Sequence, residues 1–113
     1  MAITSRLELA DFAMIAGDHK IQEFTCVDED NITPIVLAGS TVEVRYSPWG
    51  DKQYKILTKT GIIFDVNKWN VTLENEDTVN WEAGYYAFQP IVTDEFGKEF
   101  KMAQGRLWIM ESI

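Results

Sequence analysis

The 113-residue chain contains one cysteine, Cys26, and one histidine, His19. A single cysteine excludes an internal disulfide, and no pair of Cys or His residues has the spacing of a zinc site. A catalytic triad built on His19 would need an acid and a nucleophile that no local motif supplies. We therefore expect Cys26 to be a small buried hydrophobe and His19 to be a solvated side chain beside a turn. The sequence predicts no catalytic residue, no metal site, no cofactor and no enzymatic activity.

Basic residues are also few, since ten Lys and Arg stand against 18 Asp and Glu and give a net charge of −8. Such a surface is repelled by phosphate backbones, which disfavours a nucleic-acid partner. The carboxylates gather beside turn signals, as in Asp28-Glu29-Asp30, and this placement indicates solvated loop tips. That cluster lacks the later Gly and the closing bidentate Glu of a calcium loop. A DNA-mimicking or cation-binding role is the alternative that these clusters leave open.

Long apolar runs are absent as well. None approaches the ~20 residues of a membrane-spanning helix. The N-terminus lacks the basic-then-apolar layout of a signal peptide. We expect neither a membrane partner nor a secretory route.

The composition that is present fits one folded domain. Apolar residues make up 46% of the chain and aromatic residues 12%, which is too apolar for a disordered chain. No internal repeat or linker divides the sequence. We predict a single domain over residues 1–113, long enough to bury a core without disulfides.

Apolar residues recur with a period of two, which is typical of half-buried strands. The clearest alternation runs from residue 41 to 46, where Val42, Val44 and Tyr46 are predicted to point inward. Extended structure is also predicted for residues 53–60, with Tyr54 and Ile56 on one side of the strand.

Two other segments carry local signals. Residues 74–81 are polar and are predicted to contain a helical turn, and a final strand is predicted over residues 99–110, with a bulge at Gly105. The whole pattern predicts seven to nine short strands, with turns every 8–12 residues, which is the signature of an all-β sandwich.

The run Glu82–Phe88 has the pattern that enters strand F of an immunoglobulin-like sandwich: acidic, small, Gly, any residue, Tyr, any residue, core residue. The Tyr86 hydroxyl is predicted to bond to backbone a few residues upstream and to pin a corner between two sheets. Gly84 would permit a tight backbone approach there, and Phe88 stands where an antibody domain has a cysteine. The predicted fold is an all-β, immunoglobulin-like antiparallel sandwich of about seven to nine strands without a disulfide.

The four tryptophans divide into two groups. Trp69 and Trp108 are predicted to pack in the core. Trp49 lies at a hairpin tip and Trp81 precedes the corner, so both are candidates for a contact surface, because an exposed Trp can stack on a sugar ring or anchor a protein interface. For Trp49, packing within its own loop is the alternative.

Several short motifs follow one another in a fixed order between residues 15 and 110. They are a Gly-Asp start, a Leu-x-Gly strand entry, an Asp-Thr before the corner and a terminal Gly-x-hydrophobic strand, here Gly17-Asp18, Leu37-Ala38-Gly39, Asp77-Thr78 and Gly105-Arg106-Leu107. This order resembles the small immunoglobulin-like domains of tailed-phage virion proteins, most closely the N-terminal domain of the baseplate upper protein family.

The resemblance implies a bacteriophage virion structural protein, a tail, baseplate or decoration module that acts through protein–protein assembly. It implies other virion proteins as partners, a homo-oligomer, and a location in the virion after synthesis in the bacterial host cytoplasm. Exposed edge strands would suit such assembly, because another chain can complete their hydrogen bonds. Two alternatives stay open: a carbohydrate- or host-surface-binding module that uses Trp49, and an acidic inhibitor or regulator of a basic partner.

Overall fold

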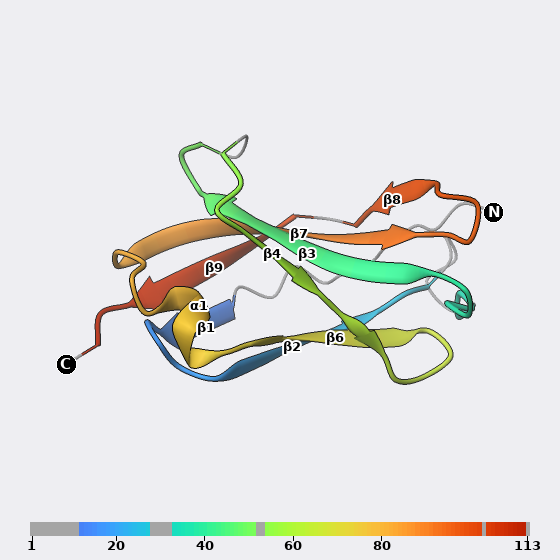
Figure 1. Ribbon diagram of the computed structural model, residues 1–113, viewed down its shortest axis with the longest axis horizontal. Helices are drawn as coiled ribbons and strands as arrows, with labels where there is room; N and C mark the ends of the chain where they lie inside the picture. The colour runs from blue at the N-terminus through green and yellow to red at the C-terminus, as the bar shows by residue number, and fades with distance from the viewer. Residues whose placement is uncertain (1–11, 28–32, 52–53, 103, 113) are drawn as a thin grey trace.

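The computed structural model describes residues 12–27, 33–51, 54–102 and 104–112. They form an all-β sandwich of two sheets with one short helical turn, which confirms the predicted fold class (Figure 1). Figure 1 shows the sheets edge-on, with β3, β7 and β9 in the upper layer and β2 and β6 in the lower one. Cys26 is buried and has no disulfide partner.

Nine strands and the turn α1 lie in the described part of the chain. Sheet A has the order β1-β9-β7-β3-β4, with β8 also paired to β7, and sheet B has the order β2-β6-β5. The bounds are β1 Phe12–Ile15, β2 Lys20–Thr25, β3 Thr41–Pro48, β4 Leu57–Thr60, β5 Ile62–Ile63, β6 Lys68–Leu73, α1 Asn75–Thr78, β7 Gly84–Thr93, β8 Glu99–Lys101 and β9 Gly105–Met110. Among the described residues the helical element is the four-residue α1. No helix in this part of the chain is long and apolar enough to cross a membrane.

One strand pair departs from the wholly antiparallel arrangement that the sequence predicted. β1 pairs with β9 in parallel, in a register that sets Phe12 opposite Leu107 and Ile15 opposite Met110. The reason is the turn that follows β1. Gly17, at φ 81°, sends the chain out of sheet A and into β2 of sheet B, so β1 and β2 never form a hairpin.

The chain crosses between the sheets a second time at Gly61. Before it, β4 pairs with β3 in sheet A, and after it, β5 pairs with β6 in sheet B. The Gly61 N–H donates to the Val42 carbonyl at 2.8 Å, and a Cβ on Gly61 would lie 2.6 Å from Cε3 of Trp69. Only glycine therefore fits between the crossing strand and the Trp69 ring.

The strand predicted for residues 53–60 is shorter than expected. Tyr54 belongs to a turn in which its N–H donates to the Asp51 carbonyl at 3.2 Å, and its side chain is exposed. Pairing with β3 begins only at Ile56, whose N–H reaches the Tyr46 carbonyl at 2.9 Å. The prediction that Tyr54 and Ile56 share one side of a strand was therefore wrong.

The core between the sheets follows the predicted alternation. Val42, Val44 and Tyr46 of β3 are all buried, and so are Phe24 and Cys26. Buried side chains also alternate along β6, where they are Trp69, Val71 and Leu73. The helical turn α1 lies within the predicted segment 74–81.

The final strand predicted over residues 99–110 is divided into β8 and β9. From Phe88 to Ile91, β7 advances three residues, whereas their partners Gly105 and Lys101 are four residues apart. The pairing register therefore shifts by one residue between β8 and β9, which agrees with the bulge predicted at Gly105. Beyond it, β9 turns Leu107 and Ile109 inward and leaves Trp108 46% exposed, so the core position predicted for Trp108 was wrong.

Candidate functional site

The corner residues lie together at the start of β7. The Tyr86 hydroxyl donates to the Glu82 carbonyl at 2.7 Å, the bond expected of a tyrosine corner. Burial raises the pKa of Tyr86, and the Glu82 charge raises it further, so the hydroxyl stays protonated to donate. Phe88 is buried in the core, where an antibody domain has its cysteine. Gly84 has φ 146° and open space around its Cβ position, so the backbone conformation, and not a close approach, accounts for glycine here.

Trp81 is half-buried against the corner. Its ring stacks on Tyr86 with centroids 4.7 Å apart and lies 6.0 Å from Tyr46. It also lines an open groove of about 500 Å³, together with Pro48 and Tyr85. Trp81 therefore supports the corner and also lines this groove.

A row of exposed aromatic side chains crosses one end of sheet A. Tyr85 and Trp108 are direct cross-strand neighbours of β7 and β9, with ring centroids 6.0 Å apart. Trp49 follows β3 on the other side, where its backbone N–H donates to the Tyr85 carbonyl at 3.2 Å. The exposed fractions are 41% for Trp49, 47% for Tyr85 and 46% for Trp108. We call these three residues the aromatic row.

Sequence reasoning selected Trp49 but missed the other two members of the row. The signal was present, because in a strand neighbouring residues point to opposite faces. If Tyr86 faces the core, Tyr85 must face outward, and if Leu107 and Ile109 face the core, Trp108 must face outward.

Beside the row, the outer face of sheet A changes from aromatic to small residues. Ala87 lies between Arg106 of β9 and Ser47 of β3. The Arg106 guanidinium leans over the Tyr85 ring, with its central carbon 4.4 Å from the ring centroid, a cation–π geometry.

Ala87 and Ser47 border a pocket of about 160 Å³ with cationic walls. The basic side chains around it are Arg45, Lys55 and Lys101, and we call this the cationic pocket. Arg45 pairs with Glu43 at 3.2 Å and with Glu99 at 3.4 Å. Desolvation lowers the pKa of Arg45, but the hydrogen bond and charge of Glu43, with those of Glu99, outweigh it and raise the pKa. The guanidinium is therefore held in place and charged.

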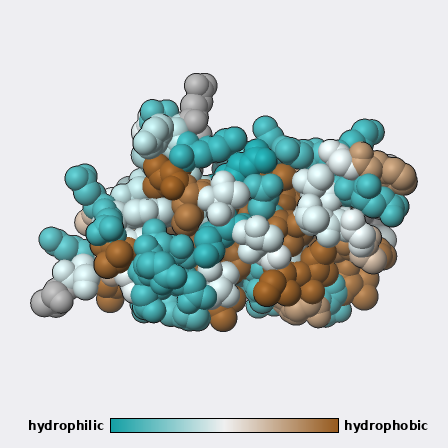
Figure 2. Space-filling view, in the orientation of Figure 1, coloured by the Kyte–Doolittle hydropathy of each residue, from teal (hydrophilic) through white to brown (hydrophobic). Residues whose placement is uncertain are grey.

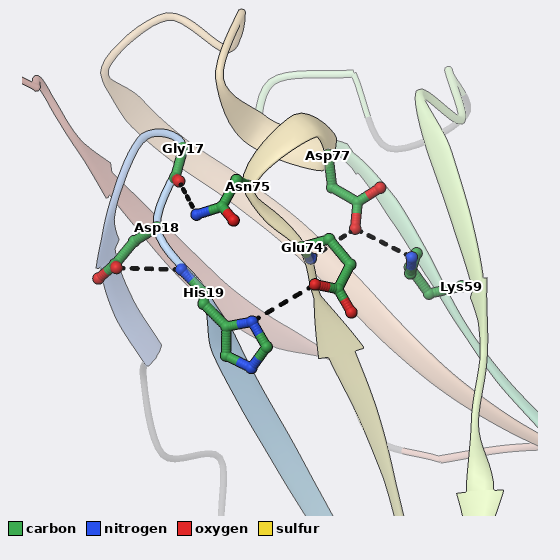
Figure 3. Close-up of polar contacts among 7 residues, drawn as sticks. All are labelled: Gly17, Asp18, His19, Lys59, Glu74, Asn75 and Asp77. Carbon is green, nitrogen blue, oxygen red and sulfur yellow. Dashed lines mark hydrogen bonds and ion pairs between the residues drawn. The ribbon is translucent and has the colours of Figure 1, made fainter.

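A second polar cluster, shown in Figure 3, lies where the turn between β1 and β2 meets α1. His19 Nδ1 lies 3.4 Å from a Glu74 carboxylate oxygen, and Lys59 Nζ lies 2.9 Å from Asp77. Asn75 donates to the Gly17 carbonyl at 2.9 Å, which ties the β1–β2 turn to α1. These contacts join two connections of the fold. Among the described residues no group of three His, Cys, Asp or Glu side chains could hold a metal ion, and Asp28-Glu29-Asp30 lies outside them.

Comparison with known proteins adds information on the fold. No family model and no curated protein matches the chain. A candidate glycoside hydrolase from Bacteroides vulgatus is similar in structure, with a TM-score of 0.53 and 12% identity over 92% of this chain and 17% of the hydrolase. CopC from Methylosinus trichosporium OB3b has a TM-score of 0.50 and 10% identity over 92% of this chain and 87% of CopC. The likeness shows the fold alone. This chain spans less than a fifth of the hydrolase.

Proposed function

We propose that this protein is a non-enzymatic carbohydrate-binding module whose binding surface is the aromatic row. The observation that carries the proposal is the pairing of Tyr85 with Trp108 on an outward sheet face, each nearly half exposed. Fully burying a large apolar side chain stabilises a protein by about 1.5–3 kcal/mol. Since each ring is about half exposed, about half of this free energy is left for a partner. Exposed aromatic rings can stack on the apolar face of a sugar, whose hydroxyls then reach the polar groups at the rim.

The small number of carboxylates that line the hollows beside the aromatic row favours sugar binding over sugar hydrolysis. Glycosidases use a pair of carboxylates about 5–9.5 Å apart across the scissile bond. The groove beside Tyr85 has one carboxylate among its lining residues, that of Glu82, and the cationic pocket has none. Among the described residues, no such pair lines either of these two hollows.

The proposal predicts that Trp108→Ala and Tyr85→Ala each weaken glycan binding by about tenfold. A stacking contact contributes about 0.5–1.5 kcal/mol beyond buried area, the buried area adds to it, and 1.4 kcal/mol corresponds to tenfold. The measurement is a glycan array followed by titration calorimetry with the best binder.

Phe96→Ala provides the matched control. Phe96 is the most exposed aromatic among the described residues, and it lies beyond the far end of β7 from Tyr85, about 30 Å away at 3.3 Å per strand residue. Its removal should leave glycan affinity unchanged. Failure of the unmodified protein to bind any glycan on the array would refute the proposal.

A second candidate function is the virion assembly role that the phage resemblance implies. One observation favours a protein contact, a group of exposed apolar side chains at one end of the sandwich. We call this group the apolar end, and its members are Val36, Ile62, Phe64 and Val66. The Leu37 N–H donates to the Val66 carbonyl at 2.9 Å, which brings the two loops together. Figure 2 shows hydrophobic atoms gathered at the lower right, over this part of the molecule. Contiguous apolar patches of this kind mark interaction sites.

Assembly through the apolar end predicts a homo-oligomer that a charge would dissociate. Phe64→Glu is expected to convert the oligomer to a monomer, because an interface would then bury an unpaired carboxylate. Sedimentation velocity measures the masses of both forms, with Tyr54→Glu, an exposed aromatic outside the apolar end, as the control. A strictly monomeric unmodified protein that is absent from purified virions would count against this role.

A further inference from the structure

We infer that the cationic pocket binds the singly charged acidic group of a sugar residue, a carboxylate or a sulfate ester, whose ring stacks on the aromatic row. The inference rests on the proposed carbohydrate-binding function and adds the class of saccharide. Its starting point is a contrast of charge. The protein carries −8 overall, yet three of its basic side chains surround one pocket that no carboxylate lines among the described residues.

The basic side chains around the pocket differ in whether they already form ion pairs. Arg45 is paired with Glu43 and Glu99. Within the part of the chain that the structure describes, Lys55 and Lys101 form no ion pair. The Arg106 guanidinium also lies beside the pocket, because Arg106 is the cross-strand neighbour of Ala87. An anion in the pocket would be attracted by these basic side chains.

The size and depth of the pocket fit a group attached to a sugar ring. Its volume of about 160 Å³ is several times the ~30 Å³ that one water molecule occupies in the liquid. Its border is low, because Ala87 and Ser47 have short side chains, whereas Arg45 and Lys101 stand around it. An anionic group can therefore enter from the open face of sheet A.

The distance from the aromatic row to the pocket also fits one sugar residue. Tyr85 and Ala87 are two positions apart on the same face of β7, which is about 6.6 Å along the strand. A ring on Tyr85 and Trp108 would thus hold its acidic substituent over the pocket. Gln89, the next outward residue, donates its amide N–H to the Met102 carbonyl at 3.1 Å, which leaves its oxygen to accept a sugar hydroxyl.

The overall charge of −8 favours singly charged anions over doubly charged ones. A carboxylate or a sulfate ester carries one negative charge. A phosphate monoester carries about two near neutral pH and would be repelled more strongly by the overall negative charge of the protein. The expected ligand is accordingly an acidic polysaccharide of the uronate or sulfated class.

Calorimetry with matched saccharides tests the inference. The probes are an oligogalacturonate, its fully methyl-esterified form, neutral dextran oligosaccharides and dextran sulfate. We expect the unmodified protein to bind oligogalacturonate at least tenfold more tightly than its methyl ester, or dextran sulfate at least tenfold more tightly than dextran. The pair that shows this preference identifies the acidic group. The preference should weaken as salt is raised, because the charges are near the surface.

The variants separate the charge from the stacking surface. Lys55→Gln with Lys101→Gln should reduce acidic binding at least tenfold and leave neutral binding within twofold. Lys98→Gln with Lys68→Gln changes the net charge equally at positions outside the pocket and should leave acidic binding within threefold. Trp108→Ala should weaken acidic and neutral saccharides alike.

Two results would overturn the inference and leave the proposed function intact. They are equal affinity for acidic and neutral saccharides, both dependent on Trp108, and a Lys55/Lys101 double variant that keeps the acidic preference. Absence of binding to every saccharide would overturn the proposed function itself.

Discussion

Replacing Trp69 with alanine is expected to lower the free energy of unfolding by about 3–5 kcal/mol. The Trp69 ring is fully buried in the core and lies 4.5 Å from the Phe24 ring, centroid to centroid. It also closes the space beside Gly61, where the chain passes from sheet A to sheet B. Removing it would leave a cavity at the junction of the two sheets, which rigid strands cannot close. Urea unfolding followed by far-UV circular dichroism measures the loss.

Trp108→Ala is the matched control, because it makes the same chemical change on the outer face. Trp108 is nearly half exposed and its main ring contact is Tyr85. We expect a loss below about 1 kcal/mol, as for most surface substitutions. Equal losses for Trp69→Ala and Trp108→Ala would contradict the assignment of inward and outward positions.

Gly105→Ala is expected to destabilise the protein by about 3 kcal/mol, at the upper end of the range for overpacked cores. A Cβ on Gly105 would lie 2.0 Å from Cζ of Phe88 and clash with the ring. The ring has little room to move, since Phe12 and Phe24 lie 5.4 Å and 6.3 Å from it between centroids. Either the bulge between β8 and β9 or the Phe88 side chain would have to shift.

A second substitution distinguishes this clash from a general effect of losing glycine. In the Phe88→Leu background the branched side chain leaves room, so Gly105→Ala should cost at least about 1 kcal/mol less there than in the unmodified protein. Gly50→Ala supplies the control, because no atom of the described residues, its two chain neighbours aside, lies within 4 Å of its Cβ position. It should change stability by less than about 0.5 kcal/mol. Gly105→Ala with no effect would mean that the Phe88 ring does not lie against the bulge.

Features encoded by neighbouring residues could be predicted from the sequence. The inward set Val42, Val44 and Tyr46 follows from alternation on one strand. The corner bond joins Tyr86 to Glu82, only four residues upstream. In each case the residues that carry the signal also make the contact.

Features that depend on the register between distant strands could not be predicted. The parallel pairing of β1 with β9 joins the first and last described strands. The cationic pocket gathers Arg45, Lys55 and Lys101 from β3, the loop that follows it and β8. No local sequence pattern indicates that these three basic side chains lie together. The core position predicted for Trp108 was wrong because its place between Leu107 and Ile109, which both face the core, decides its face.

The central claim is that the outer face of sheet A binds an acidic saccharide. The most direct measurement is a titration of isotope-labelled protein with oligogalacturonate or dextran sulfate, followed by heteronuclear NMR. The account predicts shifts in the Trp108 indole N–H and in the backbone amides of Tyr85, Ala87 and Lys101, which share this face. It predicts no shift at Phe64. Shifts confined to the apolar end, or no shift at all with either saccharide, would contradict it.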